Sequence, residues 1–244
     1  MSSPLSFDET ARLSTSIEAQ RAAVVSETAA ALLANPFWLR RFGERGRQFI
    51  LQDLNYNFDF LTAAVRVASP TSLVNYYLWQ REMLVARGLC TRHLHETQEE
   101  THRRLLERLP ELGGPLKPFF EASRTGLGYS HPDCHALDAI ELQVCEAATA
   151  CMYPRPSAEN LSQRRRCTQD NRYFLSYLLD AVAFNQPGYF LEMMAWIANF
   201  LTAFGVQADD FYTDLDWLRR EIEQQLPGEA EEFSALLRQL PAAS

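Results

Sequence analysis

The chain has 244 residues with 31 acidic and 23 basic side chains, which gives a formal net charge of −8. That length is enough to bury a large core in one domain or two. The acidic balance argues against general nucleic-acid binding, because neutralising phosphates requires a basic surface. Ten glycines and an abundance of Ala, Leu, Glu, Gln and Arg also argue against an all-β protein.

The first half of the chain predicts four helices in succession. The first helix ends before Pro36, because proline cannot continue a helix. The second is expected to bend near Gly43 or Gly46. The third opens at Ser69-Pro70, where serine can cap the helix and proline suits its first position. The predicted ranges are 8–34, 36–68, 70–88 and 91–109, followed by a short amphipathic segment at 116–123.

A linker predicted at residues 126–133 separates this half from the next, and the helical pattern then restarts. The expected helices of the second half are 133–153, 158–185, 187–204, 208–226 and a last segment at 229–240. No stretch shows the two-residue alternation that is typical of a half-buried strand. We therefore predict an all-α protein.

An internal repeat connects the two halves. Residues 52–110 align with residues 169–227 at a constant offset of 117 without a gap. Identical pairs include Asp53/Asp170, Tyr56/Tyr173, Trp79/Trp196 and Gly88/Gly205. We expect one helical domain over 1–244, built from a first repeat (1–125) and a second repeat (126–244). The two would pack face to face as one bundle with an internal pseudo-two-fold.

An aspartate and a tyrosine recur on one helix face in each repeat. Asp53 and Tyr56 share a face that is otherwise apolar, and Asp170 and Tyr173 repeat the arrangement. These side chains can line a pocket for a polar ligand. Alternatively, they form a buried Asp–Tyr hydrogen-bond network. The repeated tryptophans are expected to anchor the core or, failing that, to form pocket walls; they are Trp79 and Trp196.

The first repeat resembles the opening of the thiaminase II (TenA) family. The residues that carry the resemblance are Asn35-Pro36-Phe37, Gln52-Asp53-x-x-Tyr56 and Phe60-Leu61-x-x-Ala64. The family usually has histidine where this chain has Asn35. The resemblance implies a haem-oxygenase-like helical bundle in which Asp53 and Tyr56 contact an aminopyrimidine. It also implies a cysteine nucleophile on a later helix, for which Cys145 is the candidate and Cys151 the alternative.

A histidine-rich face on the fourth predicted helix is a candidate metal site. His95, Glu99 and His102 are spaced to share one side of the helix, and imidazole and carboxylate groups can bind iron or zinc. The Glu-x-x-His spacing also occurs in di-iron bundles. The alternative is a solvated polar face, because the corresponding stretch of the second repeat, 216–219, has no histidine. The cofactor, if any, is otherwise unknown.

These features predict a small-molecule enzyme with a central pocket, hydrolytic or oxidative, or alternatively a non-enzymatic ligand-sensing or regulatory protein. Five cysteines without CxxC spacing suggest reduced thiols and a cytoplasmic location. The longest apolar stretch, 189–206, contains Glu192, so we expect a buried helix and no membrane partner. The fourth helix starts with basic residues, and its counterpart starts with Asp209 and Asp210. This opposite charge can help two halves or two chains dock, so a homo-oligomer is possible.

Overall fold

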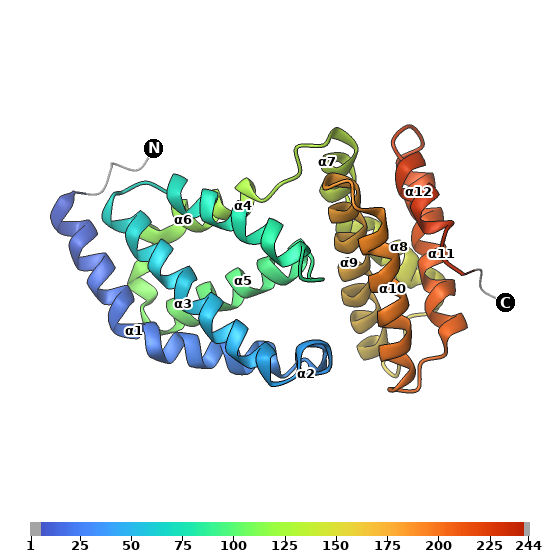
Figure 1. Ribbon diagram of the computed structural model, residues 1–244, viewed down its shortest axis with the longest axis horizontal. Helices are drawn as coiled ribbons and strands as arrows, with labels where there is room; N and C mark the ends of the chain where they lie inside the picture. Colours follow the sequence, from blue (N-terminus) through green and yellow to red (C-terminus); the bar gives the residue numbers. More distant parts are fainter. Residues whose placement is uncertain (1–5, 242–244) are drawn as a thin grey trace. The chain divides into compact units, whose positions relative to one another are not determined.

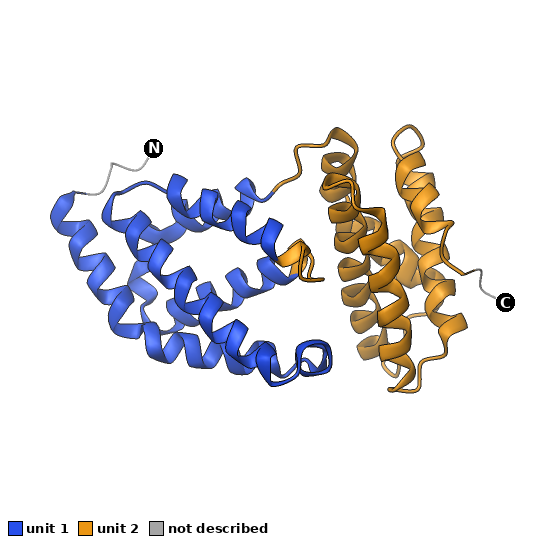
Figure 2. Cartoon of the chain, in the orientation of Figure 1, with its two compact units in different colours: residues 1–83, 93–127 blue, residues 84–92, 128–244 orange. Residues whose placement is uncertain are grey.

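The computed structural model describes residues 6–241, which form twelve α-helices and one 3₁₀ helix and contain no strand (Figure 1). The all-α prediction is therefore confirmed. The chain divides into two compact units (Figure 2). Unit 1 contains the chain up to Met83 together with His93–Leu127, and unit 2 contains Leu84–Arg92 together with the chain from Gly128 onward. A short segment from the first half of the sequence thus belongs to the second unit.

Unit 1 begins with a helix that is capped by its own sequence. The Glu9 backbone N–H donates to Ser6 Oγ at 3.3 Å, and the Ser6 N–H donates to Glu9 Oε2 at 2.8 Å, which is a capping box. The helices of this unit are α1 (Phe7–Leu33), α2 (Pro36–Phe42), α3 (Glu44–Arg66), α4 (Thr71–Val85), α5 (Thr91–Arg108), η1 (Pro110–Leu112) and α6 (Gly113–Gly126).

The expected second helix, 36–68, is two helices that meet at Gly43. Gly43 has φ 59° and ψ −152°, a conformation that only glycine adopts readily, so the predicted bend is a complete break. Asn35 caps α2 by accepting a hydrogen bond from the Phe37 N–H at 3.0 Å. The core of the unit forms mainly where α3 packs on α1, through fully buried side chains such as Ile17, Leu54 and Phe58.

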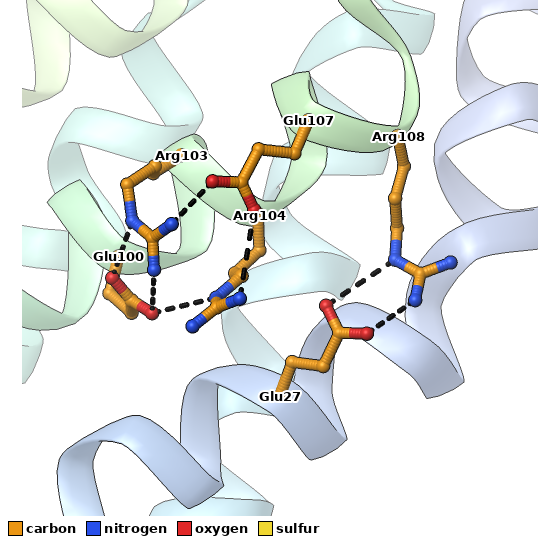
Figure 3. A network of polar contacts seen from close by, with 6 residues as sticks. All are labelled: Glu27, Glu100, Arg103, Arg104, Glu107 and Arg108. Carbon is orange, nitrogen blue, oxygen red and sulfur yellow. Dashed lines mark hydrogen bonds and ion pairs between the residues drawn. The ribbon is translucent and has the colours of Figure 1, made fainter.

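Charged side chains connect α1 with α5 on the surface of unit 1 (Figure 3). Arg108 pairs with Glu27 across the two helices. On α5, Arg103 and Arg104 both pair with Glu100, at 2.6 and 2.8 Å. Each exposed pair of this kind contributes about 0.2–1 kcal/mol, so the network adds only modestly to the stability of the unit.

Unit 2 is built around one central helix. Its helices are α7 (Pro132–Ala139), α8 (Glu141–Met152), α9 (Leu161–Ala183), α10 (Pro187–Thr202), α11 (Ala208–Gln225) and α12 (Glu231–Leu237). The expected helix at 133–153 is interrupted at Ile140, whose φ of −113° lies outside the helical range. Helices α7, α8, α10, α11 and α12 all contact α9, and its last three turns are almost completely buried.

The repeat in the sequence is also a repeat of local structure. Helices α3 and α9 both have 23 residues and start 117 positions apart. Helices α5 and α11 both have 18 residues at the same offset. The backbone between the helices repeats as well, since φ is 51° at both Ala68 and Asn185, and 84° and 83° at Gly88 and Gly205. Matched glycines and prolines therefore produce matched helix ends.

Within residues 6–241, no single helix is long and apolar enough to cross a membrane. Helices α1 and α2 reach the required length and hydropathy only when they are taken together, and they are bent by 84°.

Candidate functional site

A recess of about 380 Å³ opens in unit 2 between α9, α11 and the loop that precedes α11. Its walls combine three carboxylates with four aromatic rings. The aspartates are Asp170, Asp210 and Asp214, and the rings are Tyr153, Phe174, Phe204 and Phe211. Gln163, Arg166 and Cys167 add to the polar part of the wall.

Helical spacing explains why these side chains converge. On α9, Arg166, Asp170 and Phe174 follow one another at intervals of four residues and therefore share one face. On α11, Asp210 and Asp214 have the same spacing. The Phe174 and Phe211 rings meet edge to face, with centroids 5.3 Å apart, and so hold the two helices in register at the recess.

A buried polar network lies behind the recess. Asp214 is only 8% exposed and accepts a hydrogen bond from Asn171 Nδ2 at 3.2 Å. The Cys167 thiol donates to both carboxylate oxygens at 3.7 and 3.8 Å. Thr149 Oγ1 donates to the Cys167 sulfur at 3.6 Å and accepts from Thr168 Oγ1 at 3.0 Å. Neither partner of Asp214 is positively charged, so its negative charge is solvated only by neutral groups.

This environment shifts the pKa of two carboxyl groups upward. Burial raises the pKa of Asp214 to about 6, although the hydrogen bonds from Asn171 and Cys167 act in the opposite direction. Burial also raises the pKa of Asp170 to about 6; Arg166 lowers it and Asp214 raises it further. The Asp170 side chain remains 41% exposed because it lies on the wall of the recess, with protein packed around its other sides. At neutral pH the recess therefore holds the negative charges of Asp170 and Asp214, and that of Asp214 is largely removed from water.

The thiols of the second half are not activated. Burial and the nearby Asp214 raise the pKa of Cys167 to about 12. Cys145, the candidate nucleophile, has no exposed surface, and burial raises the pKa of its thiol far above the ordinary value. A nucleophilic cysteine needs an exposed thiolate, so Cys145 in this position has the properties of a packed core residue.

The predicted ligand-binding residues of the second repeat do not share one site in the structure. Asp170 lines the recess, but Tyr173 and Trp196 do not. Trp196 is half-buried and stacks on Phe200 at a centroid distance of 5.2 Å. The sequence analysis did not identify Asp214 as a site residue. The feature that could have revealed it is its place in an otherwise apolar stripe of one helix, beside the buried Phe211, Leu215 and Leu218.

In the first repeat, the equivalent residues lie on a more exposed face. Tyr56 is 45% exposed, and its hydroxyl accepts a hydrogen bond from Gln52 Nε2 at 3.1 Å, so it is not part of a buried Asp–Tyr network. Asp53 is half-buried. Trp79 is 55% exposed, and its prediction as a core anchor is wrong. The buried positions of α4 follow helical spacing through 73, 76, 77, 80 and 84, which leaves residue 79 on the outer side.

The predicted metal ligands line a different recess, of about 500 Å³, in unit 1. Its lining includes His95, Glu99 and His102 together with Phe120 and Glu121. The His102 ring stacks on Phe120 at 3.7 Å, and burial lowers the pKa of this histidine. Among residues 6–241, no group of three His, Cys, Asp or Glu side chains is arranged to hold a metal ion. The three predicted ligands thus share a recess without forming a metal centre there.

Comparison with known proteins finds no matching family model, no matching curated protein and no matching solved structure.

Proposed function

We propose that the protein binds a small organic cation, and that the recess of unit 2 is its binding site. The observation that carries the proposal is the pair Asp170 and Asp214, two carboxyl groups with raised pKa values in a recess with aromatic walls. A bound cation favours the charged form of both carboxyl groups and restores the favourable interactions that the buried Asp214 lost when it was removed from water. Aromatic faces add to the attraction for a positive charge.

The geometry around Asp170 leaves room for a competing cation. Arg166 approaches Asp170 only to 4.0 Å, and its side chain is 71% exposed. Such a surface pair contributes little stability, so a ligand cation can replace the guanidinium at low cost. Asp214 lies deeper and is held in place by Asn171 and Cys167, which makes it a fixed electrostatic partner for the ligand.

The geometry favours a protein that binds its ligand without catalysing a reaction. The thiol nearest the ligand, Cys167, has a pKa of about 12, and Cys145 has no exposed surface. A ligand-sensing protein needs neither thiol. The resemblance to the thiaminase II family supports a second candidate, an enzyme that acts on a basic heteroaromatic molecule. The resemblance places the aminopyrimidine at Asp53 and Tyr56 of the first repeat, and the recess of unit 2 contains Asp170, the equivalent of Asp53.

The haem-oxygenase-like arrangement belongs with this second candidate. Its support is the family resemblance together with the matched order of α3–α5 and α9–α11. An internal pseudo-two-fold axis would require each repeat to contact the other through equivalent residues.

Calorimetric titration tests the proposed site with thiamin, which carries a fixed positive charge, and with an aminopyrimidine. Asp170→Asn is expected to weaken binding at least about tenfold, because one partner of a charge pair is removed. Asp209→Asn removes an exposed carboxylate that does not line the recess and should leave the affinity unchanged. Binding of thiamin should also weaken as the pH falls below about 6, where Asp170 and Asp214 take up protons.

Absence of heat for both ligands at millimolar concentration would count against the site. Equal affinity of the wild type and Asp170→Asn would do so as well. Turnover of thiamin, followed by chromatography of the products, would select the enzymatic candidate over the sensor.

A further inference from the structure

One nine-residue segment of the chain is docked on a helix within unit 2. Residues 84–92, which run from the end of α4 to the start of α5, pack on α9, where Leu89, Cys90 and Thr91 are almost completely buried. The Thr91 N–H and hydroxyl both donate to the Asp180 carboxylate at 2.6 Å. The hydroxyl of Tyr177 donates to the Gly88 carbonyl at 3.2 Å. The segment is thus held by specific hydrogen bonds as well as by apolar contact.

The repeat supplies a second copy of this segment, and that copy is exposed. Residues 201–209 correspond to 84–92, and Gly205 has the backbone conformation of Gly88. Val206, at the position of Leu89, is 36% exposed. Ala208, at the position of Thr91, is also exposed. The loop thus has the shape of the docked segment without the cover that the docked segment receives.

The repeat also supplies a second copy of the receiving face, and it is exposed too. On α3, Phe60 stands at the position of Tyr177 and is 38% exposed, whereas Tyr177 is 1% exposed. Ala63 stands at the position of Asp180 and is exposed, whereas Asp180 is fully buried. We call the surface formed by Tyr56, Phe60 and Ala63 the α3 face.

The loop and the α3 face have changed together relative to the docked pair. Asp180 and Thr91 form a polar pair; their counterparts, Ala63 and Ala208, are both small and apolar. The double change removes the Thr91 hydroxyl and the Asp180 carboxylate together, so only the Ala208 N–H, at the position of the Thr91 N–H, loses its acceptor. A hydrogen-bond acceptor is also retained, because Asp59 replaces Ser176, which accepts the Arg92 N–H at 2.9 Å.

We propose that loop 201–209 of one chain docks on the α3 face of a second copy of the same chain, as residues 84–92 dock on α9. Each copy carries one loop and one face, so the contact is head to tail. Two copies can close into a dimer in which both contacts form, and an arrangement that does not close would add further copies. The shared register predicts that Ala208 meets Ala63 and that Val206 packs near Phe60.

Light scattering coupled to size-exclusion chromatography tests this assembly, with Ala63→Asp as the disrupting variant. The wild type is expected to run as a dimer or a larger assembly. In Ala63→Asp a carboxylate is buried opposite Ala208, which offers its backbone N–H but lacks the hydroxyl that Thr91 donates to Asp180. Burying this incompletely paired charge should raise the dissociation constant at least about tenfold. Ala195→Asp places the same substitution at an exposed position of α10 and should leave the assembly unchanged.

A second variant separates a lost contact from a damaged fold. Ala63→Asp combined with Ala208→Thr rebuilds the pair seen between Asp180 and Thr91, so the double variant should recover association. A monomeric wild type at about 100 μM would overturn the proposal. If the wild type were monomeric and Ala63→Asp lowered its melting temperature, the result would instead indicate that the loop docks on the α3 face of its own chain. An internal pseudo-two-fold requires such a contact. None of the three substituted residues lines the recess of unit 2, so the ligand titration tests the cation site separately.

Discussion

At Asp214, burial and hydrogen bonding act on one carboxyl group in opposite directions, and burial dominates. The pKa rises from an ordinary value of 3.8 to about 6. Between these two values the folded protein binds a proton that the unfolded chain does not. Asp214 therefore contributes stability below about pH 4, and this contribution is lost as the pH rises through 6.

Replacing this carboxyl group with an amide should change the pH dependence of folding. Asp214→Asn removes the charge but keeps an oxygen that can accept from Asn171 Nδ2. We expect the free energy of unfolding to rise relative to the wild type by about 1–3 kcal/mol at pH 8, and to change little at pH 4. Urea titrations at both pH values measure the difference. A wild type and a variant whose stabilities change in parallel with pH would contradict this assignment of the pKa.

Among the helices of unit 2, α9 is the one that all the others contact. Its residue Asp180 binds the segment 84–92 through hydrogen bonds. Its carboxylate accepts from the Thr91 N–H, from the Thr91 hydroxyl and, at 2.9 Å, from the Tyr129 hydroxyl. Asp180 is fully buried. Each of these donors would be left without this acceptor if the carboxylate were removed.

Asp180→Ala should therefore be strongly destabilising. We expect a loss of about 2–4 kcal/mol in the free energy of unfolding, because several buried donors lose their acceptor together. Tyr129→Phe removes only one of the hydrogen bonds and should cost about 1 kcal/mol. Chemical denaturation measures both losses, and Asp209→Ala, at an exposed position, is the matched control. A loss below 1 kcal/mol for Asp180→Ala would mean that residues 84–92 do not depend on this contact.

At the scale of the whole molecule, the two units are not consecutive pieces of the sequence. Leu84–Arg92 belongs to unit 2 although α4 and α5, on either side of it, contribute most of their length to unit 1. Unit 2 therefore lacks part of its core when it is cut from the chain at residue 128. Tyr177 and Asp180 would then be uncovered.

A fragment of residues 128–244 should consequently fold poorly by itself. We expect it to melt at a lower temperature and with a broader transition than the intact chain, since it loses the buried side chains of the segment and the hydrogen bonds to Asp180. Circular dichroism during heating measures the transition. Adding a peptide of residues 84–92 should raise the melting temperature, whereas a peptide with Thr91→Ala should raise it less. A fragment that melts cooperatively at the temperature of the intact chain would contradict this dependence.

The sequence by itself determined the local structure of this protein. Proline at 36 and glycine at 88 and 205 set helix ends, because their backbone preferences act within a few residues and need no tertiary contact. The offset of 117 indicated matched helix ends in both halves, because Pro70 and Pro187, and Gly88 and Gly205, recur at that offset. The sequence predicts a bend near Gly43 or Gly46, and the positive φ of Gly43 makes it a break between two helices.

Only the tertiary structure decided which repeated side chains are buried and which groups share a site. Tyr177 and Phe60 occupy equivalent helix positions, yet they differ in exposure because residues 84–92 cover α9 and no described segment covers the α3 face to the same extent. Asp170 and Asp214 are 44 residues apart in the sequence and meet only where α9 and α11 pack. Helical spacing reports the face of a helix on which a side chain lies. Burial depends on what packs against that face, and the spacing of residues along one helix does not report it.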